Sequence, residues 1–295
     1  MTETSLRALS IIDPHLHLVN LSTGIYSRFA DRMPGEPFGT DYLLDDLIAD
    51  AAGGPNIVGV VHVEALPDDP LREAATVSAI AATAPFPIGL VGHADLLSNG
   101  FEPILDGLAA HPSFRGIRQV ANIHPNPAFA LATRDILNAD GFEDGLRILG
   151  QRDLSFDMQI LGHQMVRGAK VSATCPQTPI VVNHAGLWSD RTPEGWATWK
   201  AGLRLLAANP NVTIKISGLG MRDAGWTTEA IRPIVYEVLD AFGPDRSMFA
   251  SNFPVDGQHA GYARIWQAFD DITAAMTSTE RDRLFHGTAR EVYRL

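Results

Sequence analysis

Eight short apolar runs rich in β-branched residues recur along the 295-residue chain, and helical segments separate them. Strands that alternate with helices are typical of parallel βα units, and eight such units close a (β/α)8 barrel. The runs are almost continuously apolar, as strands covered on both faces should be. They span Leu9–Val19, Ile57–Glu64, Ile88–Leu96, Phe114–Ala121, Leu154–Leu161, Ile180–His184, Val212–Ser217 and Ser247–Asn252.

Segments with helical spacing lie between these runs, and proline and glycine fall at the joints. A doubly wound open sheet also alternates strands and helices, but no glycine-rich phosphate loop follows the first run. We therefore predict a (β/α)8 TIM barrel, as a single domain over residues 1–295, with a long loop at Leu21–Thr40 after the first strand. The expected helices span Tyr42–Ala52, Pro70–Thr83, Ala130–Leu149, His163–Thr174, Pro193–Ala208 and Glu229–Phe242, with helical packing from Tyr262 to Leu295.

Composition limits the partners that the chain can have. The apolar fraction of 45% is enough to build a core, and 23 basic against 34 acidic residues give a net charge of −11. This charge repels nucleic acids and anionic membranes, so we expect a small-molecule substrate and neither of those partners. The single cysteine, Cys175, excludes a disulfide framework. With no leader pattern and no membrane-spanning run, we expect a cytoplasmic protein, and its oligomeric state stays open.

Two histidines end the first predicted strand. His15 and His17 are two residues apart, so their side chains leave a strand on the same face. If that face points into the barrel, two neutral imidazoles converge there, where they can hold a divalent metal or activate a water. The alternative is a histidine pair that is hydrogen-bonded in a polar turn.

Other strand ends carry polar residues that a purely structural barrel would not need. His184 closes an apolar run, and beside the histidine pair we interpret it as functional. Glu64 could orient a histidine, ligate a metal or act as a base. Arg118 needs a carboxylate partner if it is buried, since burying an unpaired charge is costly. That partner is either a substrate or an internal residue, Glu64 or Asp157.

Six motifs lie at these strand ends in order. They are Asp-Pro-His-Leu-His (13–17), Gly-Ile-Arg-Gln (116–119), Ser-Phe-Asp-Met-Gln (155–159), Val-Asn-His-Ala-Gly (182–186), Lys-Ile-Ser-Gly-Leu (215–219) and Phe-Ala-Ser-Asn-Phe-Pro-Val-Asp (249–256). Through these motifs the chain resembles the amidohydrolase superfamily, in the amidohydrolase-2-type branch that contains 2-pyrone-4,6-dicarboxylate lactonase and sugar-acid lactonases. The resemblance covers nearly the whole chain.

The resemblance implies a barrel that hydrolyses a carbonyl compound, most often a lactone. It implies that His15, His17 and His184 are the catalytic and metal-binding histidines. It also implies that Arg118 contacts a carboxylate of the substrate, and we place Gln159 and Asn252 with it in the substrate site.

The chain departs from the family pattern at two strands. Strand five ends in Asp157 and Gln159 where metal-dependent members carry a histidine. Asn252 stands where members carry an aspartate that serves as metal ligand and general base. The nearest carboxylate is Asp256, and four residues can span about 13 Å, so we expect Asp256 to compensate. We therefore expect a divalent metal such as Zn²⁺ to be weakly bound or dispensable.

The function that we predict is the opening of a small, carboxylate-bearing lactone by water. The proton of the water passes to His15, His17, Asp256 or Glu64, while His184 or Zn²⁺ polarises the carbonyl. Two alternatives stay open at this point. One is a metal-dependent decarboxylase of the same superfamily, against which Asn252 counts. The other is an inactive barrel that binds a small acid.

Overall fold

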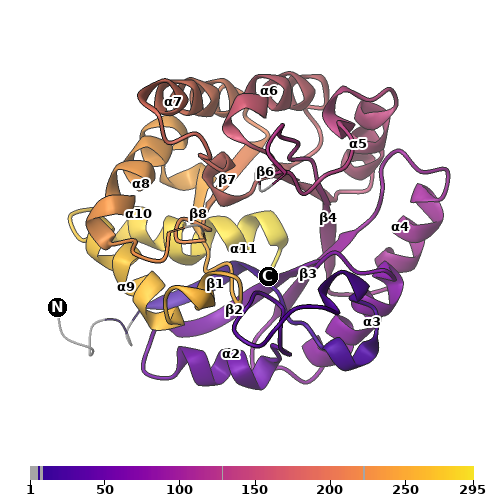
Figure 1. Ribbon diagram of the computed structural model, residues 1–295, viewed down its shortest axis with the longest axis horizontal. Helices are drawn as coiled ribbons and strands as arrows, with labels where there is room; N and C mark the ends of the chain where they lie inside the picture. The colour runs from indigo at the N-terminus through magenta and orange to yellow at the C-terminus, as the bar shows by residue number, and fades with distance from the viewer. Residues whose placement is uncertain (1–5, 7–8, 128, 222) are drawn as a thin grey trace.

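The structure is a computed structural model, and it describes residues 6, 9–127, 129–221 and 223–295. Eight strands form one parallel sheet in which each strand pairs with the next along the chain (Figure 1). Each strand begins within one residue of its predicted run, which confirms the barrel. The strands are β1 (Ser10–Leu16), β2 (Asn56–Val63), β3 (Ile88–His93), β4 (Phe114–Val120), β5 (Ser155–Gln159), β6 (Ile180–Val182), β7 (Val212–Ile216) and β8 (Ser247–Phe249).

The barrel closes through the segment that follows β8. The backbone N–H of Asn252 donates to the carbonyl oxygen of His15 at 2.9 Å, and that of His17 donates to Phe253 at 2.8 Å. The buried Asp13 side chain adds contacts, since it accepts from the backbone N–H of Ser251 at 3.0 Å. The ends of β1 and β8, which carry the predicted site residues, are therefore held side by side.

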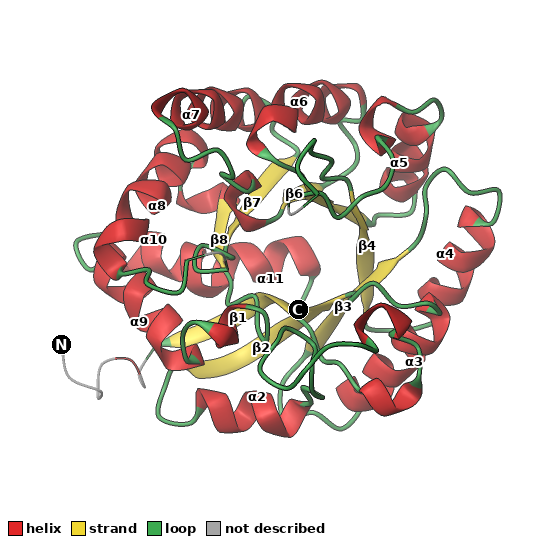
Figure 2. Ribbon diagram, in the orientation of Figure 1, coloured by secondary structure: helices red, strands yellow, loops and turns green. Residues whose placement is uncertain are grey.

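A ring of helices surrounds the sheet (Figure 2). The helix expected over Ala130–Leu149 is shorter: a 3₁₀ turn spans Ile136–Asn138, and the helix begins only after Gly141, whose φ is +87°. No helix in the described part of the chain is long and apolar enough to cross a membrane. The helices are α2 (Leu44–Ala51), α3 (Pro70–Ala81), α4 (Phe101–Ala109), α5 (Phe142–Gln151), α6 (Met165–Thr174), α7 (Pro193–Ala207), α8 (Thr228–Phe242), α9 (Tyr262–Thr273), α10 (Ser278–Asp282) and α11 (Thr288–Tyr293).

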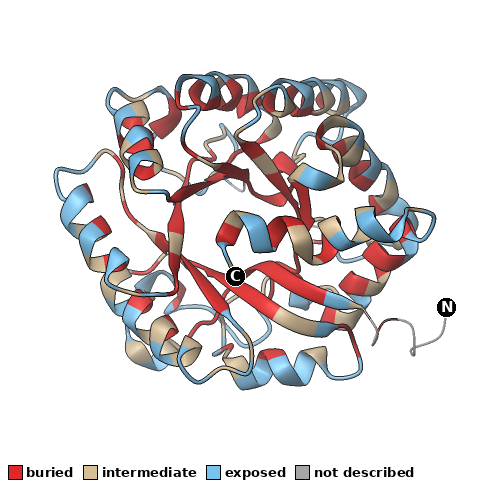
Figure 3. Cartoon of the chain, turned by 180° about the vertical axis from the view of Figure 1, so that it is seen from behind, coloured by how far each residue is buried: buried red, intermediate tan, exposed pale blue. Residues whose placement is uncertain are grey.

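The C-terminal helix α11 covers the amino end of the barrel (Figure 3). Tyr293 of α11 is fully buried in an interior apolar cluster with side chains of the strands, such as Val61 and Met248. The terminal Leu295 lies against Gly89 at the start of β3, where an added Cβ would meet its side chain at 3.2 Å. Because this end is plugged, the open end of the barrel is the one at the carboxyl ends of the strands.

Candidate active site

A cleft of about 200 Å³ lies at the carboxyl ends of the strands. This is the end where (β/α)8 barrels carry their active sites. Two of the three predicted histidines, His17 and His184, line it, as do three residues placed in the substrate site: Arg118, Gln159 and Asn252. The long loop after β1 also contributes to the lining, with Arg28, Phe29, Arg32, Pro37 and Phe38.

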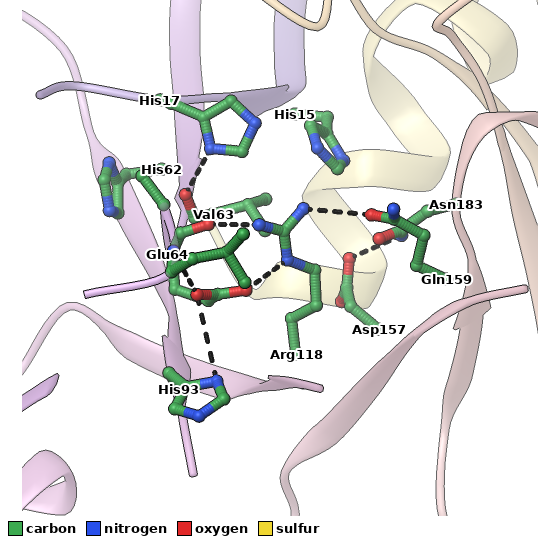
Figure 4. A network of polar contacts seen from close by, with 12 residues as sticks. His15, His17, His62, Val63, Glu64, His93, Arg118, Asp157, Gln159 and Asn183 are labelled. Atoms are coloured by element: carbon green, nitrogen blue, oxygen red, sulfur yellow. Dashed lines mark hydrogen bonds and ion pairs between the residues drawn. The ribbon is translucent and has the colours of Figure 1, made fainter. Parts of the chain in front are cut away.

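Three histidines meet at the floor of this cleft. The ring of His15 lies 5.1 Å from that of His17 and 4.5 Å from that of His184, between centroids. Nδ1 of His17 donates to the carbonyl oxygen of Val63 at 2.7 Å, which leaves the lone pair of Nε2 free (Figure 4). Nδ1 of His184 pairs with Oγ of Ser217 at 2.9 Å. The structure thus brings the predicted histidines together, with His15 fully buried behind the other two.

These histidines are neutral at physiological pH. Burial lowers the pKa of His15, His17 and His184 well below the ordinary 6.5, because the protonated ring loses its water. Repulsion from Arg118 lowers all three pKa values further, and Lys215 lowers those of His15 and His184 as well. A neutral imidazole can accept a proton at one nitrogen and donate a hydrogen bond from the other.

Several residues at the strand ends have left-handed backbone conformations. The φ angles are 53° at His184, 51° at Ala185 and 60° at Asn252. Such conformations cost non-glycine residues on the order of 1–3 kcal/mol each, and they cluster at functional sites. Two of the three lie at positions that line the cleft, so the strain coincides with the candidate site.

Arg118 forms an internal ion pair with Glu64. An internal carboxylate was one of the two kinds of partner predicted for it, and a substrate was the other. Its Nε donates to Oε1 of Glu64 at 2.6 Å, and its Nη2 donates to the Glu64 carbonyl oxygen. Its Nη1 donates to Oε1 of Gln159 at 3.3 Å, so the guanidinium bridges β2 and β5 (Figure 4). The side chain is 5% exposed and still borders the cleft.

Glu64 is occupied on both oxygens. Oε2 accepts from the backbone N–H of Leu66 at 2.6 Å and lies 3.8 Å from Nδ1 of His93. Burial raises the pKa of Glu64, but the charges of Arg118 and His93 outweigh burial and hold this pKa below the ordinary 4.5. An ionised carboxylate with both oxygens engaged holds Arg118 in place and is poorly suited to accept a proton.

A second buried ion pair lies deeper in the barrel. Nζ of Lys215 donates to Oδ2 of Asp157 at 2.6 Å and lies 3.5 Å from Nδ1 of His15. Asn183 and the hydroxyl of Tyr293 also donate to Asp157, at 2.9 Å each. This network connects the C-terminal helix to the histidine floor. The sequence analysis missed Tyr293, because the contact joins residues 136 positions apart.

The donor set does not fit a tightly held metal. The three histidine rings are neighbours, yet no three His, Cys, Asp or Glu side chains within the described ranges are arranged to hold an ion. Strand five offers Asp157, which Lys215 neutralises, and strand eight offers the neutral amide of Asn252. An anionic ligand to balance a divalent charge is therefore lacking among these groups.

Asp256 lies outside the cleft. It is 3% exposed and borders a small neighbouring cavity with Gly218, Trp226 and Phe269. Burial raises the pKa of Asp256 to about 7, and neighbouring polar groups offset this only in part. Asp256 is therefore absent from the cleft lining, which includes Asn252, although its backbone N–H donates to the carbonyl oxygen of Asn252 at 3.1 Å.

The loop after β1 supplies residues that the sequence analysis did not single out. Arg28, Arg32 and Phe38 all line the cleft. The signal for them was present in the sequence, since a long loop after a barrel strand is usually functional. Its two arginines stand out in a chain of net negative charge.

The chain is similar to several known proteins. A family model described as Amidohydrolase matches residues 12–295. Protein y4mH of Sinorhizobium fredii, which is uncharacterised, is 38% identical over 97% of this chain and 99% of its own. An L-fucono-1,5-lactonase of Burkholderia ambifaria is 29% identical over 73% of each chain. A crystal structure of an amidohydrolase from Burkholderia multivorans with bound zinc is 26% identical, with a TM-score of 0.82 over 98% of this chain and 100% of that one.

Proposed function

The chain belongs to the amidohydrolase family, and from this premise we propose that it opens the ring of a small, carboxylate-bearing lactone with water. The observation that carries the proposal is the floor of neutral histidines in a cleft bordered by three arginines. The likeness to an L-fucono-1,5-lactonase supports a lactone as the substrate class.

His17 is the general base in this proposal. Its Nδ1–H is committed to the Val63 carbonyl, so Nε2 presents a lone pair to the cleft. Nε2 takes a proton from the attacking water as the water oxygen bonds to the lactone carbonyl carbon. The low pKa of His17 makes it a weak base, which suits an activated ester better than an amide.

His184 and Asn252 stabilise the oxyanion that forms on the carbonyl oxygen. In this scheme the hydroxyl of Ser217 donates to Nδ1 of His184, 2.9 Å away, so that the ring carries its proton on Nε2 and donates into the cleft. Nδ2 of Asn252 is buried without a close hydrogen-bond partner in the described part of the chain, so it serves as the second donor in this scheme, with the neighbouring Asp256 carboxyl as the competing acceptor. Donors aimed at developing charge in a dry site lower the barrier by several kcal/mol.

The tetrahedral intermediate collapses by breaking the bond to the ring oxygen. That oxygen leaves with the proton held on His17, which restores the neutral imidazole. The product is a hydroxy acid, which ionises and releases one proton per ring opened. No step needs a metal, and no carbon dioxide is formed.

The remaining predicted residues have supporting roles. Arg118 and Gln159 orient the substrate, and Glu64 is a positioning residue that holds Arg118. His15 lies 3.5 Å from Nζ of Lys215 through its Nδ1, and in this scheme its ring supports those of His17 and His184. Asp256 takes no part in this scheme, and Asp256→Asn tests that assignment directly, since loss of turnover in this variant would make Asp256 the base.

The test of the proposed function is a screen of lactones with a pH indicator. Wild-type protein should release one proton per ring opened, and His17→Ala should lose most of this rate. His111→Ala is the matched control, because that histidine lies in the turn before β4, away from the cleft lining. Carbon dioxide release in place of ring opening would replace the proposal by a decarboxylase.

A further inference from the structure

We propose that Arg28 is the specificity-determining residue that binds the carboxylate of the substrate, so that the enzyme selects anionic over neutral lactones. This inference rests on the proposed function and assigns a part of the site that lies on the loop after β1. Five residues of the loop at 21–40 line the cleft together with His17 and His184.

The cleft differs in charge from the rest of the molecule. The chain has a net charge of −11, yet the residues that line the cleft include Arg28, Arg32 and Arg118 and neither aspartate nor glutamate. A cavity with several cations and no anion on its walls attracts small anions and repels cations. A negatively charged substrate is therefore favoured by the field of the cleft.

The three arginines are not equally available to a ligand. The charge of Arg118 is balanced by buried Glu64 at 2.6 Å. Arg32 lies 4.0 Å from Glu36 on the same loop, and both side chains are about half exposed. Arg28 forms no ion pair with any described residue and is the cation whose charge is left for a substrate.

The backbone around Arg28 is fixed before any ligand binds. The backbone N–H and the hydroxyl of Ser27 both donate to the carboxylate of Asp68, at 2.8 Å each. The hydroxyl of Tyr26 donates to buried Glu73 at 3.1 Å, and Phe29 stacks on Phe38 at 4.5 Å. A guanidinium on a fixed backbone loses less freedom on binding than one on a mobile loop.

The same loop also packs against the proposed base, and Arg28 and His17 line one cleft. The ring of Phe38 packs edge-on against that of His17, with 5.4 Å between centroids. A guanidinium binds a carboxylate through two parallel hydrogen bonds, which fixes orientation as well as position. A lactone held by its carboxylate on Arg28 would therefore present its ring toward the histidine floor.

Binding can be tested apart from turnover with ligands that contain no lactone bond. The probes are tetrahydrofuran-2-carboxylate and its uncharged analogue, tetrahydrofuran-2-carboxamide, titrated by calorimetry. Arg28→Ala should weaken carboxylate binding by about tenfold or more and leave carboxamide binding unchanged. Arg28→Lys should recover part of the loss, because it restores the charge without the two-pronged geometry.

The matched control is Arg204→Ala, which removes an equal charge from the outer helix α7 at a half-exposed position. It should change neither affinity. If Arg28→Ala weakens the binding of both probes equally, Arg28 stabilises the loop and does not bind the carboxylate. If the affinity for the carboxylate is unchanged, Arg28 is a solvated surface charge. Either result overturns the inference, as does a wild-type protein with no preference for the carboxylate.

The two proposals fail in different ways. Turnover is measured with γ-butyrolactone-γ-carboxylate and its carboxamide, for which Arg28→Ala should raise KM only for the carboxylate. Selective binding of the tetrahydrofuran carboxylate with no ring opening of any lactone would uphold the role of Arg28 and reject the proposed hydrolysis. Ring opening of neutral and anionic lactones with equal KM would uphold the proposed hydrolysis and reject the role of Arg28.

Discussion

Replacing Arg118 by methionine should destabilise the fold as well as the site. The substitution keeps an apolar stem of similar length but removes the guanidinium that contacts Glu64 and Gln159. Glu64 is fully buried, so its carboxylate would be left with the Leu66 N–H at 2.6 Å and the more distant His93.

The size of the effect follows from burial. Removing one partner of a buried ion pair leaves an uncompensated charge and costs about 3–5 kcal/mol in free energy of unfolding. Exposed pairs of the same geometry contribute about 0–1 kcal/mol, so the two cases are easily separated. The double variant Arg118→Met with Glu64→Gln removes both charges and should recover most of the loss.

The contribution of Glu64 to the free energy of unfolding should depend on pH with opposite sign in the wild type and in Arg118→Met. In the wild type the pKa of Glu64 is held below 4.5, so its contribution is present above that pH and is lost as pH falls through the lowered pKa. In Arg118→Met the charge that opposes the effect of burial is gone, so the pKa of Glu64 should rise above 4.5. The folded state then binds a proton more tightly than the unfolded state, so stability is lost as pH rises.

Urea denaturation at pH 5 and pH 8 measures these differences. The cost of Arg118→Met should be larger at pH 8 than at pH 5, and Glu64→Gln in the same background should remove that dependence. A loss below about 1 kcal/mol that is equal at both pH values would refute the reasoning, because it would mean that water reaches the pair.

Three further predictions concern other parts of the chain. Tyr293→Phe removes the hydroxyl that donates to Asp157 and should lower the free energy of unfolding by about 1–3 kcal/mol, measured by urea denaturation; no change would mean that Asp157 needs no third donor. The pKa of Asp256 is raised from 3.8 to about 7, so ionisation of this carboxyl lowers the free energy of unfolding as pH rises through that range. Asp256→Asn removes this loss, and its free energy of unfolding should rise relative to that of the wild type by up to about 1.4 kcal/mol per pH unit in the same range. Dialysis against a chelator should leave most lactonase activity, since the donor set lacks an anionic ligand; complete loss that Zn²⁺ restores would contradict this.

The barrel was predictable because its signals are local. Eight apolar runs and the prolines and glycines between them set the strands to within one residue at their starts. The segment before α5 was predicted less well, because helix formers at residues 130–141 were outweighed by Gly141, which adopts a positive φ and starts the helix late. The register of the barrel closure, through Asn252 and Phe253, has no local signal.

The cleft residues at the strand ends were predictable, but their partners and the loop residues Arg28 and Arg32 were not. Strand-end position was enough to select His17, His184 and Arg118. The choice between a substrate and Glu64 as partner of Arg118 depends on side-chain geometry across β2 and β4, which spacing does not encode. Likewise, a distance of four residues allowed Asp256 to reach the cleft, whereas the turn after Asn252 directs it to a neighbouring cavity.

The most direct test of the central claim is the rate of ring opening of γ-butyrolactone-γ-carboxylate by chelator-treated protein, followed by proton release at pH 7.5. We predict one proton per ring opened in the wild type. We predict a rate at least about a hundredfold lower in His17→Ala, because removing a general base typically costs that much or more. An undiminished rate in His17→Ala, or no ring opening by the wild type, would contradict the account.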